Sequence, residues 1–531
     1  MKKIQISDIR INVEAAASSG IDCCVENEIK KRLNTDQYQY HGLLRKSIDA
    51  RRKSNIYYEV TAAVSVEDSF KTGQLLHVED SNDFQPDRII PGTFKLQSNI
   101  IIAGAGPCGL FAALLLSRYG YHPVIIERGD DIDNRELKTR KFWVDGVLDT
   151  ESNVQFGEGG AGTFSDGKLV TRVKDKRSGY VINTFAEFGA DKAITYETKP
   201  HIGTDKLKII IKNIRSEIIK NGGTFLFNSK MTDIELKDHK VISITVNDQD
   251  EMKCDALILA TGHSARDTYE MLFKKGILMI QKSFSMGVRI EHLRNDVNHV
   301  QYGDKARYIK ESAEYFLSAK INQRSAYTFC MCPGGVVVNA ASEENSVVTN
   351  GMSFSKRNGS NSNSAWVVNV DPADFHDSHP LSGIRLQREI EQKSFLMGGS
   401  DYSLPVQKLN DFLKGEKTRK LGKITPSIAG NYRYGNLNEA LPSFISDTLK
   451  KSLPMFNNKM NFFNDRDAIL SGCETRTSSP VRIMRDEYGR SLEYSNLFPG
   501  GEGAGYAGGI TSAAIDGLKL AEQIIRTFTT D

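Results

Sequence analysis

A glycine-rich turn between an apolar strand and an apolar helix constrains the fold of this chain more than any other feature. Three glycines keep the G-x-G-x-x-G spacing: Gly104, Gly106 and Gly109. The first permits a tight turn, the second lets the backbone approach a pyrophosphate, and the third packs the helix against the strand. The turn joins a predicted strand at 100–103 to a predicted helix at 110–118. Glu127 ends the next predicted strand, where a carboxylate binds ribose hydroxyls. This segment therefore predicts a βαβ unit that binds a dinucleotide.

Strands and helices continue to alternate beyond this unit, which indicates an α/β protein with a doubly wound parallel sheet. Apolar residues at helical spacing predict a helix over 206–219, and a strand follows at 224–227. Two short strands at 231–235 and 241–246 predict a meander, and a buried strand is expected at 256–260. We therefore expect a Rossmann-like fold.

The charge balance and the cysteine content exclude several classes of protein. The 531 residues include 69 basic and 66 acidic residues, so a net charge of +3 favours neither nucleic acid nor an anionic membrane as a partner. Seven cysteines spread over this length argue against a disulfide framework, and reduced thiols are expected. The N-terminus lacks the unbroken apolar core of a secretory signal, so a cytoplasmic location is expected. These properties leave a small-molecule substrate or a redox partner, and they do not determine the oligomeric state.

An apolar run and a pair of histidines could suggest a membrane span and a metal site, but neither is predicted. The apolar run 100–116 approaches the length of a membrane helix, but the glycine turn interrupts it where a strand gives way to a helix. His376 and His379 form a His-x-x-His pair beside Pro380 without further clustered ligands, so no metal site is predicted.

Two later segments complete the dinucleotide pattern. Ala260, Thr261 and Gly262 follow the buried strand, and the segment 497–503 precedes a predicted glycine-opened helix at 508–525. The fingerprint, the A-T-G segment and the C-terminal glycine segment, in this order, resemble the FAD-binding domains of the glutathione-reductase superfamily. The resemblance implies an FAD cofactor bound without a covalent link.

The same resemblance implies roles for residues of the C-terminal segment. Glu502 stands where the superfamily has an acidic residue that hydrogen-bonds the ribityl chain, although the usual residue there is Asp. Gly508 and Gly509 would let a helix N-terminus approach the flavin and the pyrophosphate.

Three more segments resemble the bacterial proteins known as uncharacterised FAD-dependent dehydrogenases: Glu158–Leu169, Cys330–Gly335 and Glu474–Arg482. With the N-terminal region included, this resemblance spans nearly the whole chain. It implies an NAD(P)/FAD-dependent oxidoreductase fold and leaves the substrate open. The residues expected to contact FAD are Gly104, Gly106, Pro107, Gly109, Glu127, Arg128, Gly160, Gly162, Thr163, Ser165, Lys168, Ala260, Thr261, Gly262, Glu502, Gly508, Gly509 and Ile510.

The chain is long enough for several domains. Residues 1–90 are expected to form a small α+β domain that resembles a ferredoxin-like sandwich, with a linker over Pro86 to Ser98. The FAD-binding domain is expected in two parts, 98–275 and 471–531. An inserted mixed α+β substrate domain is expected between them, at 276–470, with the polar run 356–364 as a loop or lid.

The run 157–167 holds too many glycines for a helix or a strand, since each glycine costs about 1 kcal/mol inside such an element. It predicts a loop whose backbone packs against a flat or phosphorylated group. A flavin ring fits this description, with Ser165 and Lys168 as donors to its polar edge. The alternative is an Ω-loop that fills a domain junction.

Three residues are candidates for chemistry. Arg476 lies where the chain enters the C-terminal flavin segment, and its guanidinium suits a carboxylate or the charge of a reduced flavin. Ser478 would add a hydroxyl donor. The alternative is that Arg476 pairs with Glu474 or an interdomain acid. Cys332 follows Cys330 by two positions, so their side chains would share one face of an extended strand, either as a redox-active pair or as buried structural cysteines.

These patterns predict a FAD-dependent oxidoreductase that transfers hydride or electrons through its flavin to an unidentified substrate or acceptor. The sequence shows no second strand, glycine turn and helix for NAD(P)H, so a nicotinamide would serve only as a transient reductant. Two alternatives stay open. Asp166, Gly167 and Arg172 faintly resemble a motif of flavin monooxygenases. The basic cluster at 45–53 allows a flavin-bound sensor or an RNA-associated module, although a charge run is more often a solvated face.

Overall fold

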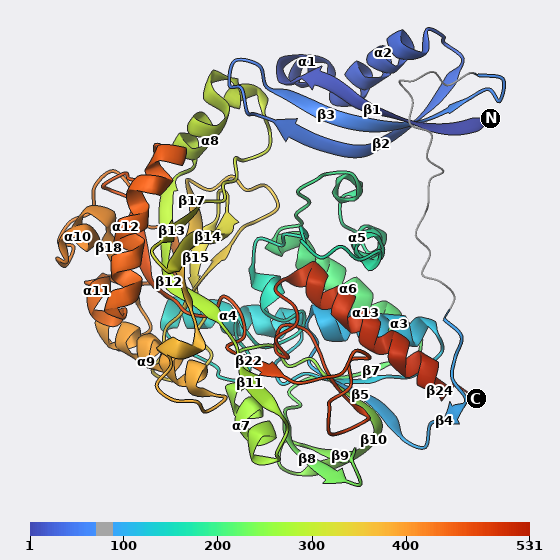
Figure 1. The fold of residues 1–531 in the computed structure, drawn as a ribbon, viewed down its shortest axis with the longest axis vertical. Helices are drawn as coiled ribbons and strands as arrows, with labels where there is room; N and C mark the ends of the chain where they lie inside the picture. The colour runs from blue at the N-terminus through green and yellow to red at the C-terminus, as the bar shows by residue number, and fades with distance from the viewer. Residues whose placement is uncertain (71–88, 531) are drawn as a thin grey trace.

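A parallel sheet with helices on one face forms one half of the molecule (Figure 1). The computed structural model describes residues 1–70 and 89–530. The strands run in the order β7-β6-β5-β10, and β23 pairs with β10. These strands are β5 (Asn99–Ala103), β6 (Val124–Ile126), β7 (Thr224–Leu226), β10 (Asp250–Leu259) and β23 (Leu497–Pro499). The helices on the covered face are α3 (Pro107–Arg118), α6 (Thr204–Lys220) and α13 (Ile510–Thr527), and all three contribute to one apolar core with the sheet. The predicted Rossmann-like α/β fold is confirmed.

A three-stranded meander covers the other face of this sheet. It consists of β8 (Met231–Lys237), β9 (Lys240–Val246) and the first half of β10. Residues 250–253 of β10 pair with β9 in antiparallel register, whereas residues 256–259 pair with β5 in parallel. One strand therefore belongs to both sheets, and helix α7 (Arg266–Lys274) packs beside them in a shared apolar core.

A second large sheet lies beside the first and is mostly antiparallel. Its strand order is β13-β14-β17-β12-β21-β18-β20. The strands are β12 (Phe284–Leu293), β13 (Ser318–Ile321), β14 (Arg324–Cys332), β17 (Asn361–Val370), β18 (Leu404–Lys408), β20 (Tyr432–Tyr434) and β21 (Ile469–Glu474). Helices α9 (Ser382–Met397) and α12 (Ser443–Lys459) contribute to the core of this region, in which Trp366 of β17 is fully buried.

Smaller elements connect these layers. The small sheets are β16-β15-β19, β11-β22 and β24-β4. Their strands are β15 (Val336–Asn339), β16 (Thr349–Met352), β19 (Ile428–Ala429), β11 (Met279–Gln281), β22 (Val481–Ile483), β24 (Phe528–Thr529) and β4 (Phe94–Lys95). The remaining α-helices are α4 (Ile132–Asp145), α5 (Arg177–Glu187), α8 (Arg294–Tyr302), α10 (Leu409–Lys414) and α11 (Leu437–Ala440).

The polar run 356–364 is only partly a loop. Asn361 to Ser364 are buried residues of strand β17, paired with β12. Their polarity misled the prediction, because the amide of Asn361 donates to the buried carboxylate of Glu291. A satisfied polar side chain occupies a core position as well as an apolar one does.

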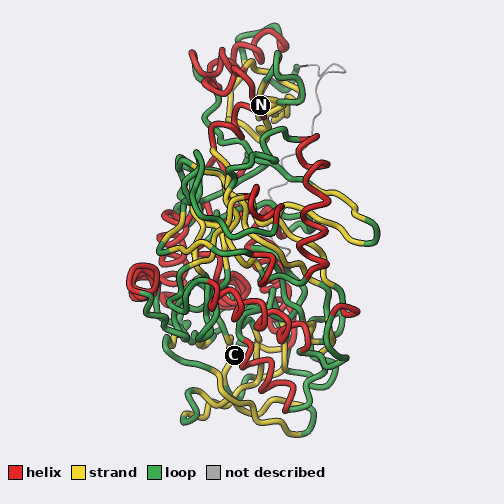
Figure 2. The backbone as a smooth tube through the Cα atoms, turned by 90° about the vertical axis from the view of Figure 1, so that its left-hand side faces the viewer, coloured by secondary structure: helices red, strands yellow, loops and turns green. Residues whose placement is uncertain are grey.

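The N-terminal region forms a separate three-stranded sheet at one end of the molecule (Figure 2). Its elements are β1 (Lys2–Asn12), α1 (Val13–Ser19), α2 (Ile21–Leu33), β2 (Tyr38–Asp49) and β3 (Tyr57–Val66). β3 lies between β1 and β2, and both pairings are antiparallel. This order matches the first three strands of a ferredoxin-like sandwich, and the described residues 1–70 hold no fourth strand. The full ferredoxin-like likeness stays a prediction, and residues 86–88 of the predicted linker lie outside the described residues.

The N-terminal sheet contacts the rest of the chain through an edge strand and a partly buried ion pair. The backbone of Lys46, in β2, exchanges hydrogen bonds with Tyr196 and Thr198. The ammonium group of Lys46 lies 2.6 Å from the carboxylate of Glu311, which also accepts the hydroxyl of Tyr58 at 2.8 Å. One residue of the basic cluster is therefore part of a packed interface.

The described residues contain no helix that is long and apolar enough to cross a membrane. The run 100–116 is instead a strand, a turn and a helix. Among the same residues, no group of histidine, cysteine and carboxylate side chains could hold a metal ion.

Candidate active site

A cavity of about 1280 Å³ lies where the parallel strands β5, β6 and β10 end. The residues that follow these strands line it, as do the glycine loop after α4 and the ends of β14 and β21. In open α/β sheets, ligands bind at this carboxyl edge. The cavity therefore lies where the fold places its ligand.

The fingerprint glycines occupy distinct environments. Gly104 has a φ of 109°, and a Cβ there would overlap the backbone of Ala260. A Cβ on Gly109 would overlap the carbonyl oxygen of Gly104, so this glycine permits close packing of α3 on β5. A Cβ on Gly106 would meet only Gly160, at 3.8 Å, on the cavity wall. Gly104 and Gly109 are thus required by the fold, whereas Gly106 keeps space free for a ligand.

Two helix N-termini line this cavity. α3 begins after Gly106 and α13 after Gly509, and neither start has a side-chain cap or an acidic residue in its first turn. The first backbone N–H groups of a helix lack intrahelical acceptors and lie at its positive end. Anionic groups such as a pyrophosphate suit these two helix starts.

Glu127 connects the glycine turn to the glycine loop. Its carboxylate accepts hydrogen bonds from three backbone N–H groups: Ala105 at 2.8 Å, Gly157 at 2.9 Å and Gly129 at 3.0 Å. A carboxylate has about four acceptor positions. One position remains for a ligand hydroxyl, as the ribose contact predicted for Glu127 requires.

The glycine loop at 157–167 wraps one side of the cavity and is held from behind by Arg135 of α4. This fully buried guanidinium donates to four backbone carbonyls: those of Asn153, Val154, Gly157 and Glu158. A Cβ on Gly157 would overlap the Arg135 side chain. The loop is therefore rigidly packed, and the sequence pattern gave no indication that Arg135 organises it.

Ser165 and Lys168 face the cavity but already have protein partners. The Ser165 hydroxyl donates to the carbonyl of Gly162 at 2.6 Å. The ammonium group of Lys168 donates to the carbonyl of Met331 and lies 3.6 Å from the Glu314 carboxylate. The one hydroxyl hydrogen of Ser165 is therefore already used, whereas the ammonium group of Lys168 has three N–H donors and can still donate to a flavin edge.

Arg128 sits at the rim of the cavity and is held in a fixed orientation. Its guanidinium pairs with Asp267 at 3.0 Å and with Glu151 at 2.6 Å, and it lies 4.0 Å from the centre of the Phe156 ring. This arrangement leaves the stem and face of Arg128 available to the cavity.

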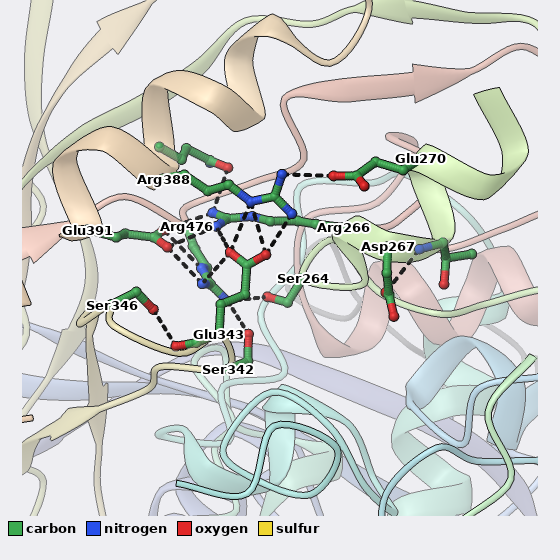
Figure 3. A network of polar contacts seen from close by, with 12 residues as sticks. Ser264, Arg266, Asp267, Glu270, Ser342, Glu343, Ser346, Arg388, Glu391 and Arg476 are labelled. Atoms are coloured by element: carbon green, nitrogen blue, oxygen red, sulfur yellow. Dashed lines mark hydrogen bonds and ion pairs between the residues drawn. The ribbon is translucent and has the colours of Figure 1, made fainter. Parts of the chain in front are cut away.

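Arg476 lines the cavity and is bound to a buried acid of helix α9 (Figure 3). Its guanidinium forms two hydrogen bonds, at 3.0 and 2.8 Å, with the buried carboxylate of Glu391 in α9. A further nitrogen donates to Ser342 at 2.6 Å and to Ser264 at 3.2 Å. Arg476 thus pairs with an acid, but the acid is Glu391 and not Glu474, and the role of Arg476 in chemistry stays a prediction.

Glu474 also lines the cavity, and it pairs with the buried Arg289. The two side chains form hydrogen bonds of 3.0 and 2.7 Å, and Thr349 donates to Glu474 at 2.8 Å. Arg289 also donates to the backbone carbonyl of Cys330 at 3.2 Å.

Two of the three residues predicted for chemistry do not reach the cavity. Ser478 and Cys332 are both absent from its lining, and Cys332 is fully buried. The cysteine that lines the cavity is Cys330. The sequence does not show which member of the pair reaches the cavity, because an irregularity between Phe329 and Cys332 breaks the alternation of strand β14.

Glu502 and His263 form a second polar pair in the cavity, 3.6 Å apart. Burial, with the nearby Cys330, raises the pKa of Glu502 to about 7. Burial and the positive charges of Arg476 and Arg266 lower the pKa of His263 to about 4. At neutral pH the imidazole is therefore uncharged, and Glu502 titrates. His263 was missed in the sequence, although it directly follows the predicted segment Ala260 to Gly262.

The structure brings the predicted FAD contacts together. Except for Gly109 and Thr163, all of them line the cavity. Thr163 is buried in the short 3₁₀ helix Ala161–Phe164, with its hydroxyl on the carbonyl of Glu158 at 3.3 Å. Gly109 and Thr163 therefore lie outside the cavity lining, and their contact with FAD stays a prediction.

Three segments of the chain match known protein families. Residues 98–278 match the family described as pyridine nucleotide-disulphide oxidoreductase, and residues 283–477 match the family described as FAD-dependent protein, C-terminal domain-like. Residues 3–65 match a domain of unknown function. An uncharacterized protein of Clostridium beijerinckii is 46% identical over 514 residues, which cover 95% of this chain and 96% of that protein.

Similar solved structures include CtdE in complex with FAD and the halogenase PltM. CtdE is 11% identical, with a TM-score of 0.31, over 81% of this chain and 87% of its own. PltM is 11% identical, with a TM-score of 0.34, over 81% of this chain and 67% of its own. Similarity at this level assigns no reaction.

The fold and the family matches define a FAD-dependent oxidoreductase, and its structure has a cavity at the carboxyl edge of a parallel sheet. Within this class, the chain belongs to the family that includes the Clostridium beijerinckii protein.

Proposed function

We propose that this enzyme binds FAD non-covalently across the cavity and exchanges hydride or electrons between the flavin and a small-molecule substrate or redox partner. The observation that carries the proposal is the meeting of two uncapped helix starts, those of α3 and α13, at one cavity. Between them, Gly106 and Gly160 expose backbone without side chains.

The lining residues divide by the part of FAD that they suit. The helix start at Gly106 suits the pyrophosphate, and Glu127 retains one acceptor position for a ribose hydroxyl. Glu502 and the start of α13 are far from the fingerprint in the sequence but line the same cavity. They suit the ribityl chain and the flavin end.

Bound FAD would supply the two-electron chemistry, and the protein would supply position and charge. Glu502 holds or releases a proton near neutral pH, and neutral His263 contacts it. The guanidinium of Arg476 adds a fixed positive charge on the cavity wall. These groups would orient a substrate and balance negative charge that develops during reduction.

A nicotinamide would bind only transiently under this proposal. The two other glycine-rich segments, 157–162 and 501–509, contribute to the lining of the same cavity, so they offer no separate site for NAD(P)H. NAD(P)H would therefore approach the flavin through the same cavity and leave after reducing it, or another reductant would take its place.

The proposal is tested by the cofactor content of the purified protein. Wild-type protein should be yellow and release FAD on denaturation, and Gly106→Val should be folded but flavin-free, since its side chain would fill the space kept for the pyrophosphate. Gly179→Val is the matched control, because Gly179 is exposed in α5 with no atom near its Cβ position. Colourless wild type that cannot be reconstituted with FAD, or a Gly106→Val variant that retains it, would contradict the proposal.

A further inference from the structure

We propose that Cys330 and Cys332 form a redox-active dithiol that exchanges two electrons with the flavin. This inference rests on the proposed function, because it requires FAD in the cavity. Cys330 lines the cavity, and Cys332 lies directly behind it, with its thiol 3.4 Å from the Cys330 carbonyl oxygen. Both are free thiols in the structure.

The backbone between the two cysteines departs from a regular strand. Phe329 pairs with Ala365 and Cys332 with Asn363, so three steps along β14 oppose two steps along β17. Cys330 has a φ of 45°, a left-handed conformation that a residue other than glycine adopts at a cost. Bulges of this kind occur next to active sites, where they redirect a side chain.

The spacing of the two cysteines permits a disulfide. Residues two apart in a regular strand are separated by about 6.6 Å, just within the limit of about 6.8 Å for disulfide-bonded Cα atoms. A disulfide so close in sequence would be strained and readily reduced.

The charges around the pair distinguish Cys330 from the other buried cysteines. A hydrogen bond from Cys332, with the positive charges of Arg289 and Lys168, lowers the pKa of the Cys330 thiol. Burial instead raises the pKa of Cys254 and Cys473 to about 12. Thiolates are the reactive form, so Cys330 is the member equipped to react and Cys332 the one that donates a proton.

Cys330 also lies near the expected flavin end of the cavity. Its negative charge contributes to the raised pKa of Glu502, the residue placed by the FAD resemblance on the ribityl chain. Lys168 connects the same strand to the glycine loop through its bond to the Met331 carbonyl. The thiol thus shares the cavity with the groups that would surround the ring.

The electron count of the step is balanced. The Cys330 thiolate and the Cys332 thiol form one S–S bond and give up two electrons and the Cys332 proton. FAD accepts the two electrons and that proton and becomes FADH⁻. In the reverse direction, reduced flavin cleaves the disulfide and restores the thiolate and the thiol. FAD is the only oxidant that the step requires.

A thiol count tests the pair without any assay of activity. Native protein is equilibrated with excess ferricyanide, or with dithiothreitol, and is then denatured and alkylated. We expect two fewer alkylated cysteines after ferricyanide, with the loss mapped by mass spectrometry to the peptide that contains Cys330 and Cys332. Cys23→Ser, which alters an exposed thiol outside the cavity, should lose the same two sites. Equal counts under both conditions would overturn the proposal.

An anaerobic dithionite titration of the FAD-loaded protein, first oxidised with ferricyanide and then freed of excess oxidant, tests the link to the flavin. Wild type and Cys23→Ser should take up four electrons per FAD, whereas Cys330→Ser and Cys332→Ala should take up two. Cys330→Ser is the informative variant if the buried Cys332→Ala fails to fold. Uptake of two electrons by wild type would overturn the exchange. Flavin-free wild type would instead contradict the proposed function, and the thiol count would still decide whether the cysteines form a disulfide.

Discussion

At the scale of single residues, the cavity contains a carboxyl group that stays partly protonated at neutral pH. Glu502 has a pKa raised from 4.5 to about 7, because burial disfavours its charged form and Cys330 adds negative charge nearby. Because the pKa of Glu502 is raised in the folded state, the contribution of this group to the free energy of unfolding is greatest below pH 4.5. That contribution is lost as the pH rises through about 7.

Glu502→Gln should remove this dependence. In FAD-free protein, the thermal midpoint of Glu502→Gln should exceed that of wild type by an amount that grows between about pH 5 and about pH 8. The gain is at most about 3 kcal/mol, because each pKa unit corresponds to about 1.36 kcal/mol. Solvent reduces it further, since the side chain is 31% exposed. Glu487→Gln, at the surface, controls for the amide replacement; a gap that stays constant with pH would rule out the raised pKa.

Residue identities at the FAD site were predictable where backbone geometry demands a particular amino acid. Gly104 and Gly106 follow from the turn and the ligand space, and Glu127 follows from the strand that it ends. Arg135 and His263 were not predictable, because only the folded chain brings them to their partners. Arg135 donates to backbone carbonyls of the loop that follows its helix, and His263 contacts Glu502, which is far away in the sequence. A short spacing located the cysteine pair, but only the bulge in β14 shows which thiol faces the ligand.

At the scale of secondary-structure elements, a buried ion-pair cluster joins α9 to α7 and to the chain after β21 (Figure 3). Glu391 of α9 is fully buried and accepts hydrogen bonds from Arg266 and Arg476. Burial acts against its charge, but Arg266 and Arg476 hold the pKa of this carboxyl below its usual value. The charge of Glu391 is therefore required to balance two buried guanidinium groups.

Glu391→Gln should lower the stability of the enzyme by about 3–5 kcal/mol, the usual cost of removing one partner from a buried ion pair. The matched control is Glu389→Gln on the same helix, whose carboxylate is 43% exposed and pairs with exposed Lys393. We expect a clear fall in the thermal midpoint for Glu391→Gln and almost none for Glu389→Gln. Equal midpoints for the two variants would show that the cluster does not hold α9 in place.

Elements with a strong apolar period were predictable, and those defined by their neighbours were not. The helix expected at 206–219 is α6, and the strand expected at 100–103 is β5. Strand β2 was missed because its residues alternate only weakly between buried and exposed positions, and it is fixed by its pairing with β3. The start of β17 was missed because its core positions are polar.

At the scale of the whole molecule, the cavity is built without the N-terminal sheet. Its lining begins at Ala103 and includes no residue of the described range 1–70. The sheet nevertheless packs on the rest of the chain, because its apolar residues share one core cluster with Val297 and Tyr302 of α8. The predicted domain boundaries stay proposals. Because of this packing, separation of the N-terminal sheet from the rest of the chain would lower the free energy of unfolding.

A shortened chain that begins at Pro91 should therefore retain FAD but lose stability. Removal of the sheet exposes apolar side chains of α8 and leaves Glu311 without Lys46 and Tyr58. We expect an unchanged ratio of FAD to protein and a lower thermal midpoint. The double change Lys46→Ala and Tyr58→Phe in the full chain should lower the midpoint in the same direction by less. A soluble but flavin-free shortened chain would show that the N-terminal sheet contributes to the cofactor site.

The use of two distant segments to build one sheet has a consequence for how the enzyme matures in the cell. Strand β23 and helix α13 leave the ribosome after all of the second large sheet, yet they complete the wall that faces the glycine turn. A nascent chain that has exposed only its fingerprint offers one of the two helix starts. Capture of FAD must then be a late event of biosynthesis, and incomplete chains should be released without cofactor.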